Sequence, residues 1–421
     1  MSSSLREFSD GILETCVTWE ETERRMREAL KTTARFGPNK SVVHIGEGNG
    51  FMSRIGLITC DWIEKKDGEV LPERFALKIA SGIASKALDV KPTDEHKDLP
   101  ETEVSEWLKE DMIRIAHNLE VEVYNFITAM NENVAMPKCY YTTPFTDKNK
   151  NAGCIALEFM ENSKINHIYD SFTVDQIRQI ARQLGKIQAL SVIHGIDKKY
   201  QFRISDLLKD FWSNFSEELI IKMISAFKTI DQGMSECVDG VIKLTPAYMG
   251  TNLSSFIIHQ MGVKPVIVNG DLWSANVLVD SENGDVKALI DWQAGHQGSG
   301  VEDLLRIMFS GLSSKDRRDN MKSLLDEMYT SMENNLGSTT APYTREEMHE
   351  MADHLLPHCG FFFVAPGGMM IQLISAPELS DEEKKRRKDV LFDKIRGICE
   401  DIVTYHEKNK LYNRNFKFIY E

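Results

Sequence analysis

The chain has few cysteines and no long hydrophobic segment. Its seven cysteines are odd in number and scattered over 421 residues, and no C-x-x-C pair occurs, so reduced thiols and a cytoplasmic location are expected. The opening Met-Ser-Ser-Ser-Leu-Arg-Glu contains no apolar signal region. The longest apolar stretch, residues 361–374, is interrupted by Pro366, Gly367 and Gly368, so no membrane span is expected.

Positive charge is scarce as well. Lysine and arginine total 50 against 64 aspartates and glutamates, which gives a net charge of −14, and no basic cluster stands out. Nucleic-acid binding needs a concentrated basic surface, so no nucleic-acid partner is expected. The sequence has no internal repeat or low-complexity tract, and it gives no sign of a required protein partner.

Residues suited to a structural zinc site are sparse. His354, His358 and Cys359 lie close together in the sequence, but Pro357 is expected to interrupt the helical face that they would need. No second pair of ligands follows at a suitable spacing, so no structural zinc is predicted.

The most informative segment is N-G-D-L-W-S-A-N at 269–276, followed by I-D-W-Q at 290–293. Phosphoryl transfer to a hydroxyl needs one carboxylate to orient and deprotonate the acceptor, and an amide with a second carboxylate to hold Mg²⁺. Asp271, Asn276 and Asp291 have this order and spacing. Short apolar runs before, between and after them predict buried strands that hold the three residues together. The alternative is that they only cap turns and end a strand.

A glycine-rich segment lies in the amino-terminal third. Gly46, Gly48 and Gly50 stand between two stretches with strand character, and residues 74–79 return as a further strand. Glycine lets backbone N–H groups approach phosphate oxygens. The G-x-G-x-G spacing followed by a strand does not match a dinucleotide-binding fingerprint, and no Gly-Lys-Ser/Thr follows as in a P-loop. A plain hairpin turn is the alternative.

Lys78 lies between Leu77 and Ile79 on an apolar strand, where an ammonium is costly unless it is paired. It is predicted to bind phosphate, the alternative being an edge-strand lysine with its head in water. A helix is expected within residues 103–130, and we expect Glu120 from this helix to pair with Lys78. Glu122 is the alternative partner.

These motifs occur in the order found in protein kinases. The sequences G-D-L-W-S-A-N and I-D-W-Q resemble those of the choline kinase-like and ecdysteroid kinase-like group, which is related to aminoglycoside phosphotransferases. The D-F-G and A-P-E sequences of protein kinases are absent. The resemblance implies an α+β, two-lobe fold, with a β-rich lobe over 1–160 and a mostly helical lobe over 161–421. It also implies an ATP-dependent and Mg²⁺-dependent kinase acting on a small alcohol, with Glu158 and Met160 at a nucleotide-binding hinge.

One residue departs from the pattern of this group, which usually has histidine where this chain has Asn269. The resemblance implies that this histidine braces the loop through hydrogen bonds and does not transfer the proton. Asparagine also donates and accepts hydrogen bonds, so we expect weaker bracing of the loop without loss of the chemistry, and Asn269→His is expected to preserve or raise activity. The departure leaves a second hypothesis open, a non-catalytic binding protein with the same fold.

The acceptor alcohol is not identified by the sequence. Trp273 and Trp292 adjoin the predicted catalytic residues and are candidate aromatic walls, with Asn269 a further candidate contact. Phe211 and Trp212 are more distant candidates. Aromatic side chains together with carboxylates suit a quaternary ammonium, and aromatic side chains alone suit a sterol or another flat apolar alcohol, so choline-like, steroid-like and xenobiotic alcohols stay open. The alternative for each of these aromatic residues is simple packing in the core.

Three capping boxes predict helix starts. They are Thr173-x-x-Gln176, Thr344-x-x-Glu347 and Ser380-x-x-Glu383, and each precedes a segment with helical apolar spacing.

Overall fold

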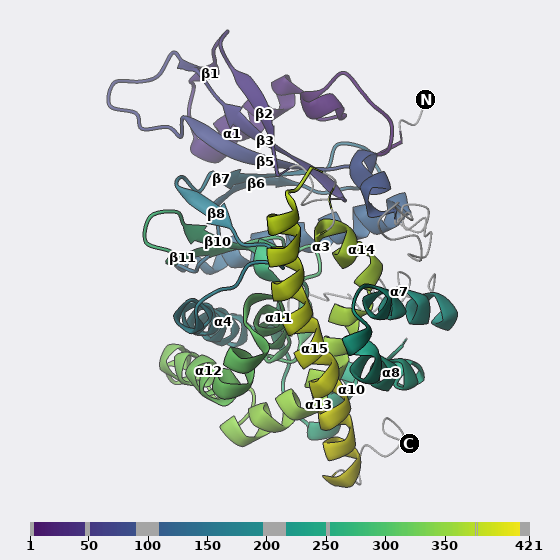
Figure 1. Ribbon diagram of the computed structural model, residues 1–421. Helices are drawn as coiled ribbons and strands as arrows, with labels where there is room; N and C mark the ends of the chain where they lie inside the picture. Colours follow the sequence, from purple (N-terminus) through teal and green to yellow (C-terminus); the bar gives the residue numbers. More distant parts are fainter. Residues whose placement is uncertain are drawn as a thin grey trace. The chain divides into compact units, whose positions relative to one another are not determined.

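The computed structural model describes residues 4–46, 51–89, 109–196, 216–249, 253–374, 376 and 378–412 (Figure 1). Contacts divide the chain into two compact units: the first contains residues up to Asp89 and from Glu103 to Asn162, and the second runs from Ser163 onward. The first unit is rich in sheet and the second is mostly helical, which confirms the predicted α+β class.

An antiparallel five-stranded sheet forms the centre of the first unit. Its strand order is β2 (Ser41–Ile45), β3 (Ser53–Thr59), β5 (Arg74–Ala80), β7 (Cys154–Glu158) and β6 (Cys139–Thr143). β1 (Arg35–Phe36) and β4 (Trp62–Ile63) form a separate two-stranded sheet, whose Phe36 and Trp62 pack in the same hydrophobic cluster as Phe75. The strands predicted around the glycines and Lys78 are thus present.

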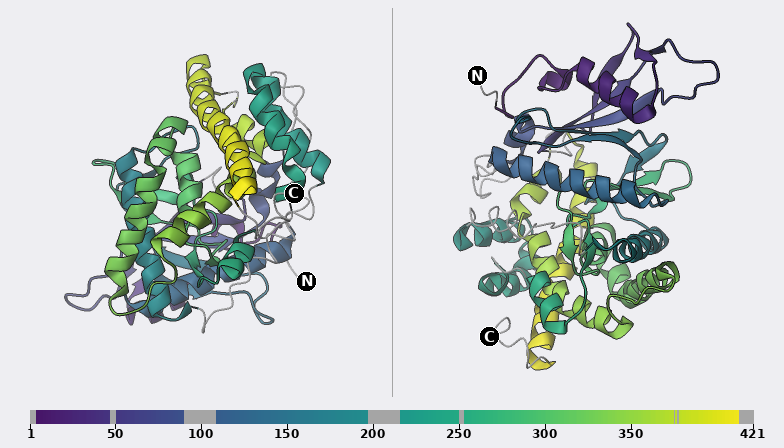
Figure 2. Two further views of the ribbon diagram at one scale, coloured as in Figure 1. Left: turned by 90° about the horizontal axis from the view of Figure 1, so that it is seen from below. Right: turned by 180° about the vertical axis from the view of Figure 1, so that it is seen from behind.

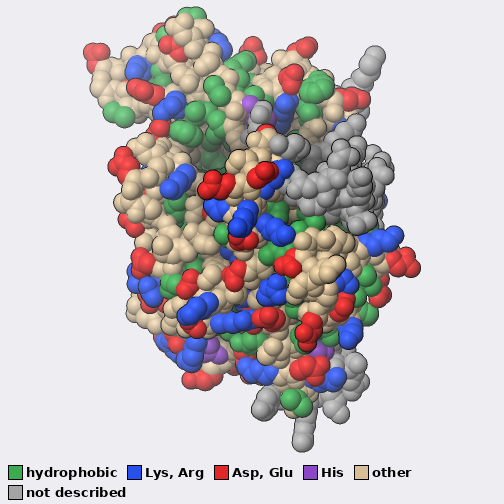
Figure 3. Space-filling view, in the orientation of Figure 1, with side chains coloured by type: hydrophobic (Ala, Val, Ile, Leu, Met, Phe, Trp, Pro, Cys, Tyr) green, Lys and Arg blue, Asp and Glu red, His purple; other side chains and the backbone are tan. Residues whose placement is uncertain are grey.

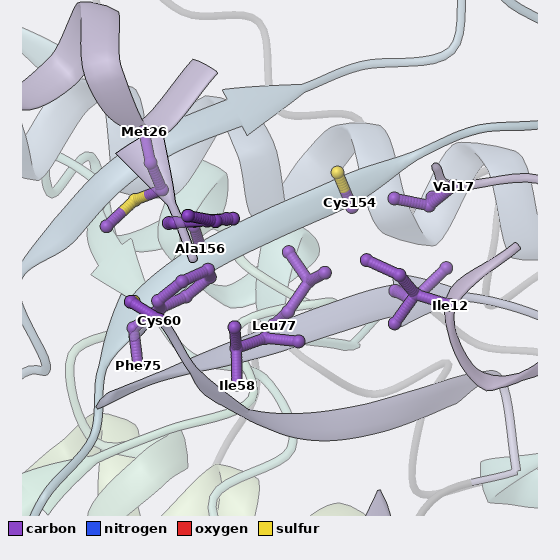
Figure 4. Close-up of a cluster of buried hydrophobic side chains, with 11 residues drawn as sticks. Ile12, Val17, Met26, Ile58, Cys60, Phe75, Leu77, Cys154 and Ala156 are labelled. Carbon is purple, nitrogen blue, oxygen red and sulfur yellow. The ribbon is translucent and has the colours of Figure 1, made fainter. Parts of the chain in front are cut away.

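Alternation along β5 gives the sheet two different faces, because successive side chains of a strand point to opposite sides. Phe75, Leu77 and Ile79 are fully buried in a hydrophobic cluster with Met26 (Figure 4), while Lys78 points to the opposite face. Lys78 lies opposite Ile55 of β3 and Ile155 of β7, so β5 is a central strand and the edge-strand alternative is wrong.

Helices cover both faces of this sheet (Figure 2, right). α1 (Trp19–Leu30) packs through Met26 on the face with Phe75. α3 (Glu110–Met130) supplies Ile113 to a second cluster with Ala80. The 3-10 segments η1 (Ile12–Glu14) and η2 (Ile83–Leu88) complete this unit. The predicted helix over 103–130 is present from Glu110, and residues 103–108 lie outside the described part.

In the second unit, two small antiparallel sheets contain the strands that come before and after the 269–276 segment. One has the order β11 (Val286–Leu289), β10 (Val277–Asp280) and β8 (Ser163–Ile165), and the other pairs β12 (His296–Gly298) with β9 (Val266–Val268). A 3-10 turn, η4 (Ser274–Asn276), lies between β9 and β10. The short buried strands predicted next to the motif are confirmed.

The remainder of the second unit is helical. Its helices are α4 (Val174–Ile193), α7 (Glu217–Ile230), α8 (Ser235–Lys243), α9 (Thr245–Tyr248), α10 (Leu253–Met261), α11 (Glu302–Gly311), α12 (Ser314–Leu336), α13 (Arg345–Val364), α14 (Gly367–Ile374) and α15 (Asp381–Tyr412), with a 3-10 turn η3 (Gln232–Met234). α4 packs closely on α12 because Gly185 faces it, where a Cβ would lie 2.2 Å from the carbonyl oxygen of Met328.

The predicted helix starts agree with the structure. Complete capping boxes begin α4 at Thr173 and α13 at Thr344, and the Ser380 hydroxyl accepts a hydrogen bond from the N–H of Glu383 (3.2 Å) ahead of α15. These starts were predictable because a capping box depends only on residues three apart.

The expectation that Pro357 interrupts its helix is wrong, since α13 continues through it. Proline cannot donate to the carbonyl four residues earlier, which belongs to Asp353. The Asn409 side chain, from α15, donates to that carbonyl instead (2.8 Å). Within the described ranges no group of three or more His, Cys, Asp or Glu side chains is arranged to hold a metal ion.

Charges of both signs are interspersed on the face of the second unit seen in Figure 3. Ion pairs at the surface of this unit include Arg318 with Glu400 and Lys408 with Asp353. In the part of the chain that the structure describes, no helix combines the length and apolar character that crossing a membrane requires.

Candidate active site

Lys78 and Glu120 form a buried ion pair in the first unit. The Lys78 ammonium lies 2.7 Å from the Glu120 carboxylate, and the two side chains are 10% and 2% exposed. Glu122 points to the exposed side of α3. The predicted pairing with Glu120 is therefore confirmed, and the alternative partner is wrong. Burying such a pair is costly, so a pair of this kind is weak evidence for stability and better evidence for a function.

His117 lies one helical turn before Glu120 and ties α3 to the sheet. Its Nε2 makes a 2.9 Å hydrogen bond with the carbonyl of Thr143 in β6. Burial, with a smaller contribution from the charge of Lys78, lowers the pKa of His117 to about 4 although the hydrogen bond to Thr143 raises it, so the imidazole is neutral near pH 7 and donates this bond. The neutral His117 therefore adds no positive charge beside Lys78.

The other candidate nucleotide contacts of this unit are only partly described. Gly46 follows β2 directly and has a φ of +73°, a conformation that glycine adopts without strain. Gly48 and Gly50 lie outside the described residues. Glu158 is the last residue of β7, is exposed, and accepts a hydrogen bond from the N–H of Lys138 (3.3 Å). Met160 follows two residues later.

In the second unit, Asn269 connects the two motif segments. Its side-chain oxygen accepts from the N–H of Asp271 (3.1 Å), and its side-chain nitrogen lies 3.2 Å from the carbonyls of both Ile290 and Asp291. The side chain is fully buried. Asn269 therefore braces the loop, and in this arrangement it is not exposed to an acceptor molecule.

Asp303, near the start of α11, holds the same loop from the other side. Its carboxylate accepts from the N–H groups of Asn269 (2.7 Å) and Gly270 (2.9 Å). Burial raises the pKa of Asp303 to about 6, although the two N–H donors lower it. Asp303 stands in the D-L-L-R segment after I-D-W-Q, but its spacing alone gave no sign of this contact.

Two residues of the site have left-handed backbone conformations. Gly270 has a φ of +81°, and a Cβ there would lie 2.3 Å from the carbonyl oxygen of Ala294, so only glycine fits. Asp291 has a φ of +59°. Such a conformation is uncommon for a non-glycine residue and is typical of functional positions. The Asn269 side chain helps to hold it through the Asp291 carbonyl.

Asn276 ends the 3-10 turn with its amide fixed. Its side-chain nitrogen donates to the carbonyl of Asp271 (2.8 Å), and its backbone carbonyl accepts from the N–H of Ile290 (3.0 Å). Because the amide nitrogen is used inside the loop, the amide oxygen is the atom left for a cation. The structure thus brings Asp271, Asn276 and Asp291 into one hydrogen-bonded assembly.

The two candidate tryptophans differ in exposure. Trp292 is completely buried, and its indole N–H donates to the carbonyl of Leu289 (3.2 Å), so it is a core residue in this arrangement. Trp273 is partly exposed and contacts the edge of His167, with ring centroids 5.4 Å apart. His167 in turn stacks on Tyr169 (4.3 Å). Phe211 and Trp212 lie outside the described residues.

Lys394 of α15 is a residue that the sequence analysis missed. Its buried ammonium donates to the carbonyls of Ile168 (2.9 Å), Asp170 (2.5 Å) and Ser310 (2.6 Å). The Ser310 hydroxyl accepts from the N–H of Ser274, inside the motif loop (3.0 Å). A signal was present, because Lys394 lies three residues after Leu391 and four before Ile398 on the apolar face of the helix.

A family model matches residues 5–410 of this chain; it is called DUF1679 and carries the description "Uncharacterized oxidoreductase dhs-27". The chain is 22% identical over 298 residues to "Uncharacterized oxidoreductase dhs-27" of Caenorhabditis elegans, a match that covers 68% of this chain and 34% of that protein. It is 35% identical over 92 residues to "Uncharacterized kinase-like protein D1044.1" of the same organism, covering 22% of this chain and 24% of that protein. The chain thus matches about a third and a quarter of the lengths of these curated relatives.

Among solved structures, a putative aminoglycoside phosphotransferase from Ralstonia eutropha is similar, with 12% identity, a TM-score of 0.42, and coverage of 92% of this chain and 98% of that one. The family model spans nearly the whole described chain. The chain belongs to the DUF1679 family, which is the ecdysteroid/choline kinase-like family that the motifs resemble.

Proposed function

We propose that this chain transfers the γ-phosphoryl group of ATP to a hydroxyl of a small alcohol. The observation that carries the proposal is the buried Asn269 side chain, which binds the backbone of both Asp271 and Asp291. A positioned carboxylate, a fixed amide and a second carboxylate are the groups that phosphoryl transfer needs, because the protein contributes mainly positioning and charge stabilisation.

In this proposal Asp271 orients the acceptor hydroxyl and takes its proton, and Asn276 and Asp291 hold Mg²⁺. The donor set suits the ion, because Mg²⁺ prefers carboxylate and amide oxygens and keeps further positions for water and phosphates. The amide oxygen of Asn276 is directed away from its hydrogen bond to Asp271, which supports this assignment. When bound, Mg²⁺ would neutralise phosphate charge.

The first unit would bind the nucleotide. Lys78 is proposed to contact the α- and β-phosphates, and Glu120 holds its ammonium in place. The remaining proposed contacts are Gly46, Gly48 and Gly50 over the phosphates, and Glu158 and Met160 beside the base. Residues 1–160 and 161–421 would then be the two functional lobes of a cytoplasmic enzyme.

Trp273 is the proposed acceptor contact. It adjoins Asp271 in sequence and is partly exposed, whereas Trp292 and Asn269 are buried. Burial lowers the pKa of His167, its aromatic neighbour, to about 4, so this imidazole is uncharged near pH 7. An uncharged aromatic surface suits a quaternary ammonium or a flat apolar alcohol, and choline-like, steroid-like and xenobiotic alcohols all satisfy it.

A binding protein without turnover is the second candidate, and Asn269 in place of histidine is the observation that favours it. The name of one relative and the description of the family model contain the word oxidoreductase. That relative is about three times longer than the matched segment. The glycines of this chain stand between strands β2 and β3 and lack the G-x-G-x-x-G spacing that opens a dinucleotide-binding helix, so the name lends this chain no support.

The test is ATP consumption by the full chain with Mg²⁺ against choline, a steroid alcohol and a panel of xenobiotic alcohols, with the phosphorylated product identified by mass. Asp271→Asn should reduce acceptor-dependent turnover by at least about two orders of magnitude, as loss of a positioned base does. Asp389→Asn, the same change on the exposed side of α15, is the matched control and should have wild-type turnover.

Acceptor-dependent product from the wild type would exclude the binding-only candidate. Mg-ATP binding without product from any alcohol would favour it. Turnover of Asp271→Asn within a few-fold of wild type would assign the base to another residue.

A further inference from the structure

The first unit contains a cavity on the α1 side of its sheet, away from the Lys78 side. Its volume is about 440 Å³, within the range of small-molecule sites. The start of α1, the inner residues of β6, the connection from β6 to β7, and the beginning of β7 line it. No residue predicted to bind nucleotide, metal or acceptor is among the lining residues.

Three hydroxyl groups in the lining are buried without a satisfied hydrogen bond. They belong to Thr22, which is 1% exposed, and to Tyr141 and Thr143. The Thr22 and Tyr141 hydroxyls lie beside each other, and the Tyr141 and Thr143 hydroxyls lie beside the Cys154 thiol. None of the three oxygens meets a partner with full hydrogen-bond geometry in the described part of the chain. Leaving a buried hydroxyl unsatisfied costs about 1–3 kcal/mol, so three at one cavity need an explanation.

Charge in the lining is balanced. Glu21 and Arg25 are its only charged residues, and they pair with each other at 2.9 Å between Glu21 Oε1 and Arg25 Nε. Glu21 also pairs with Arg24 outside the cavity. A charged ligand would find no unpaired opposite charge and would be disfavoured by desolvation, whereas a neutral ligand loses little.

Apolar groups provide the rest of the wall. Val17 and Cys154 both belong to the hydrophobic cluster of the sheet (Figure 4), and Pro144 and Ala152 come from the connection between β6 and β7. Burial raises the pKa of the Cys154 thiol to about 11, although the neighbouring Thr143 and Tyr141 hydroxyls lower it, so the thiol stays protonated near neutral pH and adds no charge to the wall.

We propose that this cavity is a second ligand site, which binds a neutral small molecule with an apolar body and a carbonyl or hydroxyl oxygen directed at Thr22, Tyr141 and Thr143. The inference does not depend on the proposed kinase function.

The site also has a physical connection to the other face of the sheet. The Thr143 carbonyl is the acceptor of His117, which precedes Glu120 on α3. A ligand that moves Thr143 would therefore act on the helix that carries Glu120.

The experiment uses 2-adamantanone as the probe, with the full chain. This ketone has a compact apolar body and one carbonyl acceptor, and because it has no hydroxyl it cannot accept a phosphoryl group. Binding is followed by NMR of ¹³C-labelled alanine and valine methyl groups, since Ala152 and Val17 line the cavity. We expect saturable shifts of these two methyl groups, with a dissociation constant on the order of 1 mM or tighter for a ligand of this size.

Hydroxyl deletions test the oxygen contact. Thr22→Val and Tyr141→Phe should each weaken binding by about threefold to tenfold, the effect of one hydrogen bond. Tyr140→Phe is the matched control, because Tyr140 is the neighbouring tyrosine on β6 but does not line the cavity. This variant should bind 2-adamantanone with the affinity of wild type. Ala152→Phe should fill the cavity and abolish the shifts at Val17.

The proposal is overturned if the ketone causes no saturable shift at Val17 and Ala152. It is equally overturned if Thr22→Val and Tyr141→Phe bind the ketone as tightly as Tyr140→Phe does. Should Ala152→Phe fail to fold, the two hydroxyl deletions decide the question alone, because they keep side-chain shape.

Discussion

At the scale of single residues, the structure revises the role that the sequence predicts for Asn269. Asparagine in place of the usual histidine predicts a weaker brace of the loop. Instead, the asparagine side chain accepts one hydrogen bond from Asp271 and lies within bonding distance of two carbonyls, in a space with no exposure. The loop is therefore built around the size and donor pattern of an amide, which a sequence without coordinates does not reveal.

This geometry reverses the expected result for Asn269→His. A neutral imidazole has one donor, so it cannot serve both carbonyls, and its larger ring must fit a fully buried space. We now predict a loss of about 1–3 kcal/mol in unfolding free energy, as overpacking usually causes, together with reduced turnover. Chemical denaturation and acceptor-dependent turnover measure the two effects.

The control for this change is Asn334→His, which places the same substitution at an exposed position of α12 and should leave both quantities unchanged. Higher stability and turnover of Asn269→His would restore the original expectation. In that case the loop must relax to accept the ring, and asparagine would be the weaker brace.

At the scale of helices and strands, features with local causes were predictable. The capping boxes at Thr173 and Thr344 and the strands next to the motif depend on residues close in sequence. The path of α13 through Pro357 was not predictable, because the donor that replaces the missing N–H is the side chain of Asn409, 56 residues from the carbonyl it serves. Such a contact exists only once α13 and α15 pack together.

Lys394 is a second contact between distant elements. Three carbonyls from the segment before α4 and from the end of α11 surround its ammonium, so one α15 side chain fixes two other elements. Burial lowers the pKa of Lys394 to about 7, although Asp170 and Asp393 raise it. The ordinary value for lysine in the unfolded chain is 10.5.

The unfolded chain therefore binds more protons at Lys394 than the folded chain does between about pH 7 and 10.5. Stability must rise with pH across this window, and the full cost of burying the charge is present below about pH 7. We predict that wild type gains stability relative to Lys394→Met as pH rises from 7 to 10, with a slope of up to about 1.4 kcal/mol per pH unit. Denaturation curves of both proteins at a series of pH values measure this slope.

Comparing the two proteins cancels the titration of all other groups. The control is Lys385→Met, on the exposed side of the same helix, whose free energy of unfolding should change with pH in parallel with that of wild type. If the free energies of unfolding of wild type and Lys394→Met also change in parallel between pH 7 and 10, the ammonium does not titrate in this range. Its three carbonyl contacts would then outweigh the effect of burial on its pKa.

At the scale of the whole molecule, the sequence placed the groups of the candidate site in the right elements, but it gave only some of their contacts. The Lys78–Glu120 pair was predictable because a buried ammonium on an apolar strand needs a carboxylate, and the next helix offers few. The hydrogen bonds from Asn269 and Gly270 to Asp303 were not predictable, because they depend on how the start of α11 packs on the loop that follows β9. The proposed roles of Asp271, Asn276 and Asp291 call for measurements on the complete chain.

Thermal stabilisation by Mg-ATP separates these roles in one experiment. A ligand at 100 times its dissociation constant stabilises the folded chain by about 2.7 kcal/mol, so binding raises the unfolding temperature. Lys78→Met and Asp291→Asn should each lose most of this rise, because one removes a phosphate contact and the other a metal ligand. Asparagine is the right replacement for Asp291 because it tolerates the φ of +59° better than alanine, so the change removes charge without adding strain. Asp271→Asn should keep the full rise, since its carboxylate is assigned to the acceptor and not to the nucleotide. Loss of the rise in Asp271→Asn would mean that Asp271 binds the metal, and an undiminished rise in Asp291→Asn would remove Asp291 from the metal site.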